Sequence, residues 1–381
     1  MFLANQSFAF TDTLLAYITP KFIFLMGSNR YRLKKDEEEL LIQYRTIKQK
    51  SQDLGIPIKD VKHGWLKNKE TSMFFKNPLY DDGSFNIHEF DFEKAFKNIK
   101  PISVDKVKLK SNLDAEFDKL VISDIHIGMD ASDNGRSLYN HTWTKDDIFK
   151  TLDQIVAFTI QNQKSNILYI KDLGDMLDGF NGQTTRGGHH LPQNMTNEEA
   201  FDVGFEFKVK LTESLLPYYH KIHFHNINND NHSGSFAYCL NKAFEVLMHK
   251  AYSGKVTVVN QLKFLDYSIV GNYCFVTTHG KDSQHMKHGF KPKIDPNQIN
   301  KIIGYLTANN LLNKGYDIIV EKGDSHQYLF DSASSDLFKY YNYPALSPSS
   351  NWVQTNFQKG QRGFIFFNYY ENRKAIHEYF F

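Results

Sequence analysis

Acidic and imidazole side chains follow apolar runs at several separate places in this sequence. The stretch KDLGDMLDGFNG, residues 171–182, places Asp175 and Asp178 three residues apart between two glycines, directly after an apolar run. Asp124 and His126 end an earlier apolar run in the same way. A plain turn uses Asp and Gly for their backbone preferences alone. A metal site uses the same residue types, because carboxylates and imidazoles bind divalent cations.

Three further apolar runs end in similar residues. NNDNHSG at 228–234 contains Asn231 and His232, THG at 278–280 contains His279, and GDSH at 323–326 contains Asp324 and His326. Oxygen and nitrogen ligands without thiolate suit Mn²⁺, Fe²⁺, Zn²⁺ or Mg²⁺. Because there are too many candidates for one four-coordinate ion, we expect two divalent ions roughly 3.5–4 Å apart that share a carboxylate.

The apolar runs alternate with amphipathic segments, which predicts strands alternating with helices. Repeated strand–helix–strand units predict an α/β sandwich with a partly parallel sheet and an antiparallel C-terminal pair. Ligands of such sheets bind beyond the carboxyl ends of the strands, so the polar strand ends should meet at one edge. An extended Asp-x-His segment would direct Asp124 and His126 to the same side. The main strands are expected at 120–126, 166–175, 221–228, 273–280 and 317–324, and the helices at 144–163, 197–219, 235–250 and 295–312.

The bulk composition is that of a globular protein. The chain has 381 residues, of which 41% are hydrophobic and 23% charged, enough for a sizeable core. Cys239 and Cys274 are the two cysteines, which excludes a disulfide framework and fits a reducing compartment. We expect a cytoplasmic location, or the host cytoplasm for a phage-encoded protein. The apolar stretch 14–27 is broken by Pro20 and Lys21 and is too short to span a bilayer, so no membrane association is expected.

The N-terminal part of the chain is more basic than the rest. Residues 1–110 hold about 19 Lys and Arg against about 14 Asp and Glu, which leaves about 26 against about 29 for the remainder. Residues 26–76 are predicted to be helical, with one helix at 36–51 and a second within 53–67. Two helices joined by a glycine-containing turn have the outline of a helix-turn-helix, and a small helical cap is the alternative. Lys59, Lys62 and His63 would face nucleic acid from the second helix.

Four segments are therefore expected. Residues 1–25 form an uncertain extension, and one hypothesis is that Met26 is the true start. The helical module at 26–76 is followed by a polar linker at 77–117 and by the metal-binding domain at 118–381. Within that domain Arg186 lies on a glycine-rich loop that either grips phosphate or is simply solvated.

The order of the motifs resembles the calcineurin-like metallophosphoesterase superfamily. D-x-H, G-D-x-x-D, N-H, a strand-end His and G-x-x-H follow one another over roughly residues 118–330, and the nearest resemblance is to the DNA-repair exonuclease branch of bacteria and phages. The resemblance implies a four-layer αββα sandwich. It also implies that one metal is held by Asp124, His126 and His326, that Asp175 bridges both metals, that Asn231 and His279 hold the second, that His232 acts as general acid, and that Asp178 supports the site.

Three positions depart from the family pattern. Asp230 and Ser233 flank the Asn-His pair in place of the usual Gly and acidic residue, and Ser233 is expected to weaken the orientation of His232. Asp324 stands where a His ligand of the second metal is usual. Asp also ligates Mn²⁺ and Mg²⁺, so we expect either a shifted metal preference, with Mn²⁺ the leading candidate, or a weakened second site.

The resemblance implies a phosphoesterase in which a hydroxide held by two metals attacks phosphorus and His232 protonates the leaving alkoxide. The basic N-terminal module favours a nuclease that hydrolyses phosphodiester bonds in nucleic acid. A phosphomonoesterase acting on small phosphoesters or phosphoproteins is one alternative. A DNA-binding protein with a degenerate phosphoesterase domain is the other. The sequence identifies no protein partner.

Overall fold

The structure is a computed structural model of the chain. The residues that it describes fall into two compact units, one within Met1–Ser84 and the other within Phe85–Phe381. The predicted boundary at residue 26 and residues 77–112 of the predicted linker at 77–117 lie outside the described residues, so these boundaries stay predictions. The described residues are 48–49, 52–53, 57, 63–67, 72–76, 113–135, 137–138, 140–282, 285–287, 291–356 and 360–381.

The first unit contains a β-hairpin where the second helix of a helix-turn-helix was predicted. Strand β1 (His63–Lys67) pairs antiparallel with β2 (Ser72–Lys76). The helical prediction is therefore wrong at 63–67 and 72–76, because a short apolar pattern at helical spacing does not outweigh the strand preference of aromatic residues such as Trp65, Phe74 and Phe75. Residues 48–49 and 52–53 are helical. Lys59 and Lys62 lie outside the described residues.

The second unit is built on two sheets. The six-stranded sheet has the order β13-β12-β3-β4-β5-β6, and β3 to β6 run parallel. The five-stranded sheet has the order β10-β11-β9-β8-β7, in which β8, β9 and β11 run parallel. The strands of the first sheet are β3 (Phe117–Ile122), β4 (Ile167–Asp172), β5 (Lys221–Ile227), β6 (Val256–Gln261), β12 (Gly363–Tyr369) and β13 (Lys374–Phe380); those of the second are β7 (Asp266–Val270), β8 (Tyr273–Thr278), β9 (Asp317–Lys322), β10 (Leu329–Asp331) and β11 (Lys339–Asn342).

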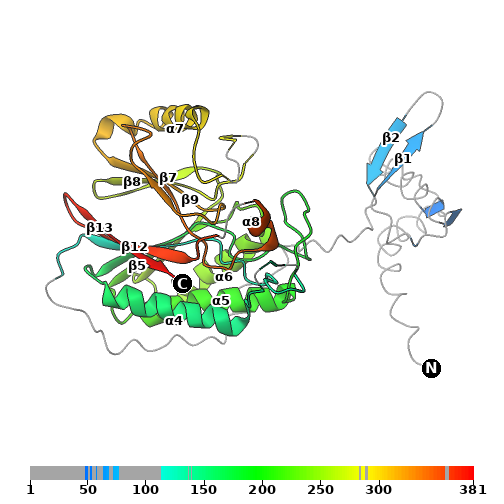
Figure 1. Cartoon of the computed structure of the whole chain (residues 1–381), viewed down its shortest axis with the longest axis horizontal. Helices are drawn as coiled ribbons and strands as arrows, with labels where there is room; N and C mark the ends of the chain where they lie inside the picture. Colours follow the sequence, from blue (N-terminus) through cyan, green and yellow to red (C-terminus); the bar gives the residue numbers. More distant parts are fainter. Residues whose placement is uncertain are drawn as a thin grey trace, which may run out of the picture. The chain divides into compact units, whose positions relative to one another are not determined.

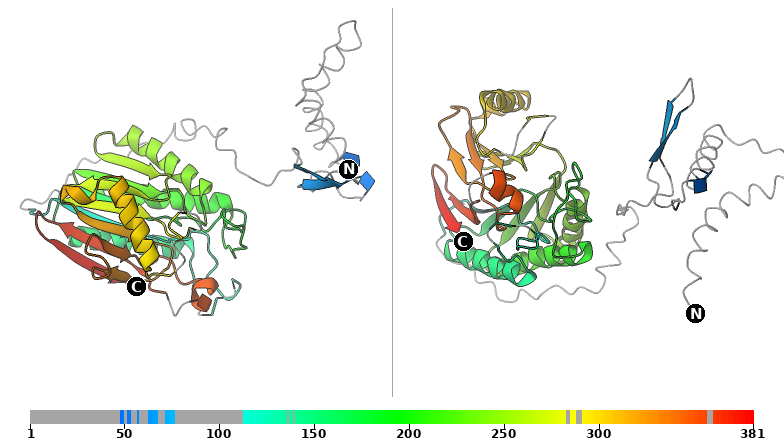
Figure 2. Two further views of the ribbon diagram at one scale, coloured as in Figure 1. Left: turned by 90° about the horizontal axis from the view of Figure 1, so that it is seen from above. Right: turned by 45° about the vertical axis from the view of Figure 1, so that its right-hand side comes forward.

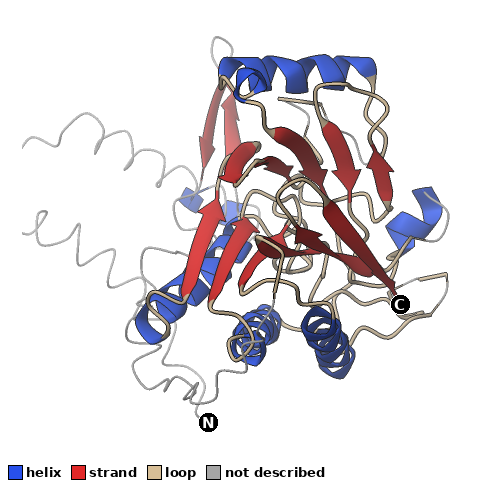
Figure 3. Cartoon of the chain, turned by 90° about the vertical axis from the view of Figure 1, so that its left-hand side faces the viewer, coloured by secondary structure: helices blue, strands red, loops and turns tan. Residues whose placement is uncertain are grey.

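Helices cover the outer face of each sheet. Figure 1 shows α4 (Lys145–Gln161), α5 (Asn197–Leu215) and α6 (Ser235–Ala251) along one sheet and α7 (Pro296–Ala308) along the other. Figures 2 and 3 show the same layering from other directions. A short helix, α8 (Asn351–Asn356), lies in the loop before β12. Within the described part of the chain, no helix is both long and apolar enough to cross a bilayer.

Three hydrophobic layers hold this arrangement together. One lies between the six-stranded sheet and α4 to α6, one between the two sheets, and one between the five-stranded sheet and α7. A layer of apolar side chains on each side of each sheet is what a sandwich of two covered sheets requires. The predicted mixed α/β four-layer sandwich is confirmed.

The helices begin where the sequence provides caps. Thr144, Thr196 and Asp295 each form a capping box with the side chain three residues later, and Pro296 occupies the first turn of α7. A capping box satisfies two backbone amides that the first turn leaves without partners. These caps fix the register of α4, α5 and α7 on the sheets.

A buried ion pair joins the two sheets at β3 and β9, before the strand ends that carry candidate ligands. Lys119 on β3 lies 2.5 Å from Oε1 of Glu321 on β9, and the Tyr343 hydroxyl donates to the same oxygen at 2.6 Å. The Lys119 ammonium also lies 3.8 Å from the ring centroid of Phe275. Because an unpaired buried charge is costly, this pair fixes β3 against β9. The residues that follow these two strands carry the candidate metal centre.

Candidate metal centre

The candidate ligands follow their strands in an unusual backbone conformation. Asp124, His126, Asp175, Asp324 and His326 have φ values of 53°, 49°, 50°, 65° and 52°. Left-handed φ in residues other than glycine costs of order 1–3 kcal/mol each and is concentrated at functional sites. The expectation that an extended strand aligns the Asp-x-His pair is therefore wrong, because β3 ends at Ile122 and the pair lies on the turn that follows.

Neighbouring strand ends hold this turn in place. Asp124 N donates to Gly174 O at 3.0 Å, and His126 N donates to Asp175 O at 2.9 Å. The indole Nε1 of buried Trp143 donates to Ile125 O at 2.8 Å. The left-handed residues are thus stabilised by hydrogen bonds that the sequence does not reveal.

The first predicted ligand group comes together in the structure. The Nε2 atoms of His126 and His326 lie 3.1 Å apart, and His326 Nε2 is 3.4 Å from Oδ1 of Asp124. His126 Nε2 lies 3.8 Å from the same oxygen. Oδ1 of Asp124 is buried and accepts no hydrogen bond. Two imidazole nitrogens and one carboxylate oxygen that converge in this way fit the preferences of a divalent ion.

Asp175 lies between the first group and the second. Its Oδ2 atom is 3.1 Å from His279 Nε2 and 3.9 Å from Nε2 of both His126 and His232. The backbone N–H of His232 donates to Oδ1 of Asp175 at 3.2 Å. One carboxylate therefore faces ring nitrogens from three other strand ends, the position that a bridging ligand requires.

Gly174 makes this close approach possible. Its φ is +103°, and a Cβ atom at this position would lie 2.8 Å from Nδ1 of His279 and 3.1 Å from Cβ of Asp230. A side chain here would displace the His279 ring. The glycine before Asp175 is thus needed both for its backbone conformation and for the space that it leaves.

The second predicted group contains buried polar atoms without hydrogen-bond partners. Asn231 Oδ1, His279 Nε2 and Asp324 Oδ2 are all buried and unpaired. His279 Nδ1 donates to Leu173 O at 2.8 Å, which leaves Nε2 unprotonated in the neutral ring and 3.8 Å from Oδ1 of Asp324. His279 Nε2 is near Asp175 without the alignment of a hydrogen bond. Buried polar atoms normally have partners, so this donor set fits a cation. The Asp324 carboxylate therefore lies beside His279, where a ligand of the second metal was predicted.

Asp178 supports two imidazoles at once. Nδ1 of His126 donates to Asp178 Oδ1 at 2.8 Å, and Nδ1 of His232 donates to the same oxygen at 3.1 Å. The partner that orients His232 is therefore Asp178, and the expectation that Ser233 weakens this orientation is wrong. Ser233 instead belongs to the start of α6, where the Asp230 carboxylate accepts from its N–H at 2.7 Å.

His232 differs from the other imidazoles in its accessibility. Its side chain is 20% exposed, whereas those of His126, His279 and His326 are at most 6% exposed. A molecule that approaches from solvent can therefore reach His232 and not the deeper rings. This is the geometry expected of a group that exchanges a proton with a substrate.

The electrostatics of the cluster favour bound cations. Burial alone would raise the pKa of Asp175, but the imidazoles of His279, His232 and His126 lower it well below its usual value. Burial alone would lower the pKa of His279, but Asp175 and other carboxylates raise it to about 10. The carboxylates thus hold positive charge in the site, which protons supply when no metal is bound. Metal binding should release protons.

Arg186, which was predicted either to grip phosphate or to be simply solvated, lies on an exposed part of its loop. Its Nη1 donates to Lys281 O at 2.8 Å, and its Nη2 donates to Asn229 Oδ1 at 2.7 Å. The guanidinium thus binds the protein's own loops. His189 and His190, from the same loop, are exposed. Of the residues predicted to contact nucleic acid, His63 lies on strand β1 and not on the helix that was predicted to carry it.

Two further histidines, His223 and His225, make contacts within the sheet. His223 stacks on Tyr169 with ring centroids 4.6 Å apart. His225 accepts from buried Lys171 and donates to Gln261, at 2.9 and 2.7 Å. Both lie on β5, before its end, and neither faces the ligand cluster.

Sequence reasoning missed several residues that shape the site. Gly323 is one, because a Cβ atom there would lie 2.2 Å from Ser123 Oγ and 2.9 Å from Asp124 Oδ2. Ser123 donates to Asp124 Oδ2, and Ser347 N donates to Asp124 O at 3.1 Å. Glycine before Asp324 was a visible signal, but no pattern in the sequence pointed to Ser347.

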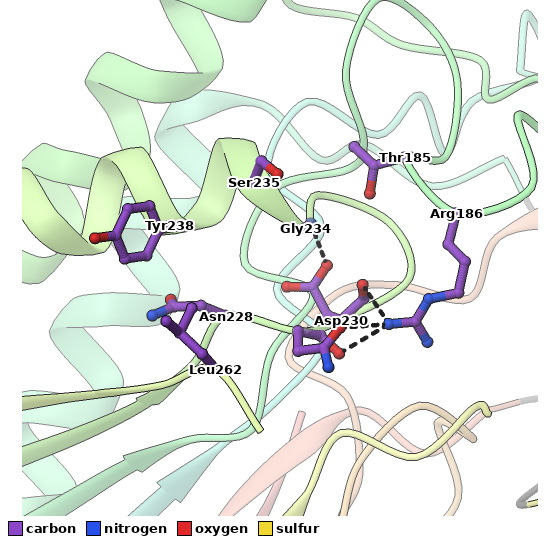
Figure 4. A pocket seen from close by; sticks show the side chains of 9 residues that line it. Thr185, Arg186, Asn228, Asp230, Gly234, Ser235, Tyr238 and Leu262 are labelled. Carbon is purple, nitrogen blue, oxygen red and sulfur yellow. Dashed lines mark hydrogen bonds between the residues drawn. The ribbon is translucent and has the colours of Figure 1, made fainter. Parts of the chain in front are cut away.

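A cavity of about 480 Å³ lies beside the loop that carries Asn231 and His232. Figure 4 shows its walls, with Tyr238 from α6 at one side and Arg186 at the other. Polar and apolar groups both line the cavity, and its size is within the range of small-ligand pockets. Its lining residues are Thr185, Arg186, Asn228, Asn229, Asp230, Gly234, Ser235, Tyr238 and Leu262.

No protein-family model matches this chain, and no curated protein matches it. Among solved structures it is similar to wild-type Vps29 complexed with Zn²⁺ from Entamoeba histolytica, at 12% identity over 69% of this chain and 92% of that chain, with a TM-score of 0.34. It is also similar to a predicted phosphoesterase from Streptococcus pneumoniae, at 9% identity over 69% of this chain and 97% of that chain, with a TM-score of 0.27. A third similar structure is a 5'-nucleotidase from Candida albicans, at 11% identity over 71% of this chain and 52% of that chain, with a TM-score of 0.29. TM-scores this low do not establish a shared fold, so the functional inference rests on the site residues.

Proposed function

We propose that this protein is a metal-dependent phosphoesterase of the calcineurin-like superfamily that hydrolyses phosphodiester bonds in nucleic acid. The observation that carries the proposal is the convergence of carboxylate and imidazole atoms from separate strand ends on one buried spot, with several of those atoms unpaired. Among the described residues, three groups have donor atoms close enough together to hold an ion: Asp124 with His126 and His326, Asp124 with Asp175 and His279, and His126 with Asp178 and His232. Two divalent ions, when bound, supply Lewis acidity that activates water and neutralises charge on the phosphoryl oxygens.

The protein's own residues divide the remaining work. Asp124, His126 and His326 would hold one ion, Asn231, His279 and Asp324 the other, and Asp175 would contact both. Oxygen ligands predominate in the second set, which favours Mn²⁺ or Mg²⁺ over Zn²⁺ there.

His232 is assigned the proton transfer to the leaving group. Its Nδ1–H is held by Asp178 at 3.1 Å, so Nε2 is the atom presented to the site. The carboxylate of Asp178 fixes the orientation of the ring, and the partial exposure of the ring lets a substrate oxygen reach it. Asp178 thus acts on the substrate through the two imidazoles that it holds, those of His232 and His126.

The nuclease assignment follows from the basic N-terminal part of the chain, because Lys and Arg contribute most of the sequence-independent affinity for nucleic acid. A direct test is hydrolysis by the full chain, with Mn²⁺, of single-stranded DNA, duplex DNA, RNA and a phosphomonoester. Faster turnover of a polynucleotide than of the monoester is expected. Turnover of the monoester alone would favour the phosphomonoesterase, and no turnover of any substrate would favour a degenerate domain.

The role of His232 has a sharper test. With His232→Asn, turnover should fall by about 10²–10⁴-fold for a diester with an alkoxide leaving group, but much less for a p-nitrophenyl ester, whose leaving group needs no proton. His249→Asn, at the exposed end of α6, is the matched control. Equal losses on both esters would contradict general-acid catalysis by His232.

A further inference from the structure

The loop at 184–190 is held in one shape by its own hydrogen bonds. Thr184 N donates to His189 O at 2.8 Å, and His189 N donates to the Thr184 hydroxyl at 2.9 Å. The same hydroxyl donates to Arg186 O at 3.0 Å, and Thr184 is 6% exposed. A buried threonine thus organises the loop, although His189 is itself exposed.

The backbone of this loop binds the segment that carries the Asn-His pair. Thr185 N donates to His232 O at 2.9 Å, and Arg186 N donates to Asn231 O at 3.1 Å. The carbonyl groups of both predicted functional residues are therefore fixed by consecutive amides of one loop. This leaves their side chains free for the site.

The Arg186 side chain connects the same segment to a second strand end. Its Nη2 donates to Asn229 Oδ1 at 2.7 Å, to Asn229 O at 3.2 Å and to Asp230 O at 3.3 Å, and Figure 4 shows the guanidinium directed toward the loop at Asp230. Its Nη1 donates to Lys281 O at 2.8 Å. Asn229 and Asp230 directly precede Asn231, and Lys281 follows His279 by two residues.

Arginine is suited to this bridge and lysine is not. The guanidinium is a rigid planar fork whose two terminal nitrogens donate in different directions, whereas an ammonium is a point charge on a flexible stem. Two loops can therefore be held at a fixed separation by one arginine. Both loops carry predicted ligands of the second metal.

We infer that Arg186 is a positioning residue, which fixes Asn231 and His279 relative to each other and thereby sets the affinity of the second metal ion. This inference rests on the proposed function, since it concerns the same metal centre. Among the described residues, the Arg186 side chain donates to Asn229, Asp230 and Lys281 and not to the ligands of the other ion, Asp124, His126 and His326, which should be unaffected.

Calorimetric titration of Mn²⁺ into the metal-free full chain tests the inference. The wild type should bind two ions. In Arg186→Met and Arg186→Lys one of the two events should weaken by about 10–100-fold, the usual effect of losing a group that orients metal ligands. The other event should not change. Arg373→Met, at an exposed arginine beside Asp114, is the matched control and should leave both events unchanged.

A second measurement does not depend on metal. In the metal-free protein, hydrogen exchange of the amides at 229–232 and 280–282 should be faster in Arg186→Met than in the wild type or in Arg373→Met. If the wild type binds no Mn²⁺, the proposed function fails, while faster exchange in both segments still supports the bridge. Unchanged exchange in both segments, or equal weakening of both ions, overturns the positioning role.

Discussion

Replacement of Asp175 by asparagine isolates the charge of the central carboxylate. Asn has nearly the same volume and keeps an oxygen that can accept from His232 N, which lies 3.2 Å from Oδ1. The residue is 2% exposed, so solvent cannot compensate for the lost charge. Asp175→Asn therefore changes the electrostatics of the site with little change in packing.

The expected magnitude follows from the distances. Oδ2 of Asp175 lies 3.1–3.9 Å from the ring nitrogens of His126, His232 and His279 that surround the site. At about 4 Å and an effective dielectric constant of about 20, one unit charge contributes about 4 kcal/mol to the binding of another. A divalent ion carries twice the charge, so the lost interaction energy is twice as large. Relaxation of the surrounding groups recovers part of this energy. We expect each ion to bind at least about 1000-fold more weakly.

Two assays report on this variant. Mn²⁺ calorimetry should show weaker binding of both ions, and hydrolysis should be abolished. In the metal-free protein the pKa of His279, which the carboxylates raise to about 10, should fall, and an NMR titration of its ring resonances measures this. Asp153→Asn, on the exposed face of α4, is the control. If Asp175→Asn keeps wild-type turnover with Mn²⁺ and unchanged affinity for two ions, the bridging assignment is wrong.

Three further outcomes are expected. Asp178→Asn should weaken the ion held by His126 and lower kcat by about 10–100-fold, because a charged partner of the metal ligand is lost, and unchanged calorimetry would contradict this. Gly174→Ala should lower the free energy of unfolding by about 2 kcal/mol or more in urea denaturation, since its φ is +103° and the new Cβ would collide with His279; an unchanged midpoint would refute the steric argument. Burial lowers the pKa of Lys171 to about 7, so between about pH 7 and 10.5 the unfolded chain binds a proton that the folded chain does not. Its contribution to stability should therefore rise with pH in this window by about 1.4 kcal/mol per unit, and Lys171→Met should remove that slope.

Much of the fold could be read from local patterns. Apolar runs such as 167–170 predicted strands, and amphipathic segments such as 144–163 predicted helices, because both signals depend on residues near in sequence. The prediction failed at 63–67, where a short apolar pattern was compatible with either a helix or a strand. β10 and β11 were not predicted, since each has only three or four residues.

The sequence by itself determined which chemistry is available to this protein: carboxylate, imidazole and amide groups placed at the ends of successive strands, without thiolates. Only the tertiary structure decided how these groups meet. The left-handed backbone at Asp124 and Asp175, the sharing of Asp178 by two histidines, and the bridge from Arg186 to two loops all depend on contacts between residues distant in the chain. Residue types are fixed by the sequence, but the direction of each side chain depends on the packing of several strand ends against one another, and no local pattern encodes that packing.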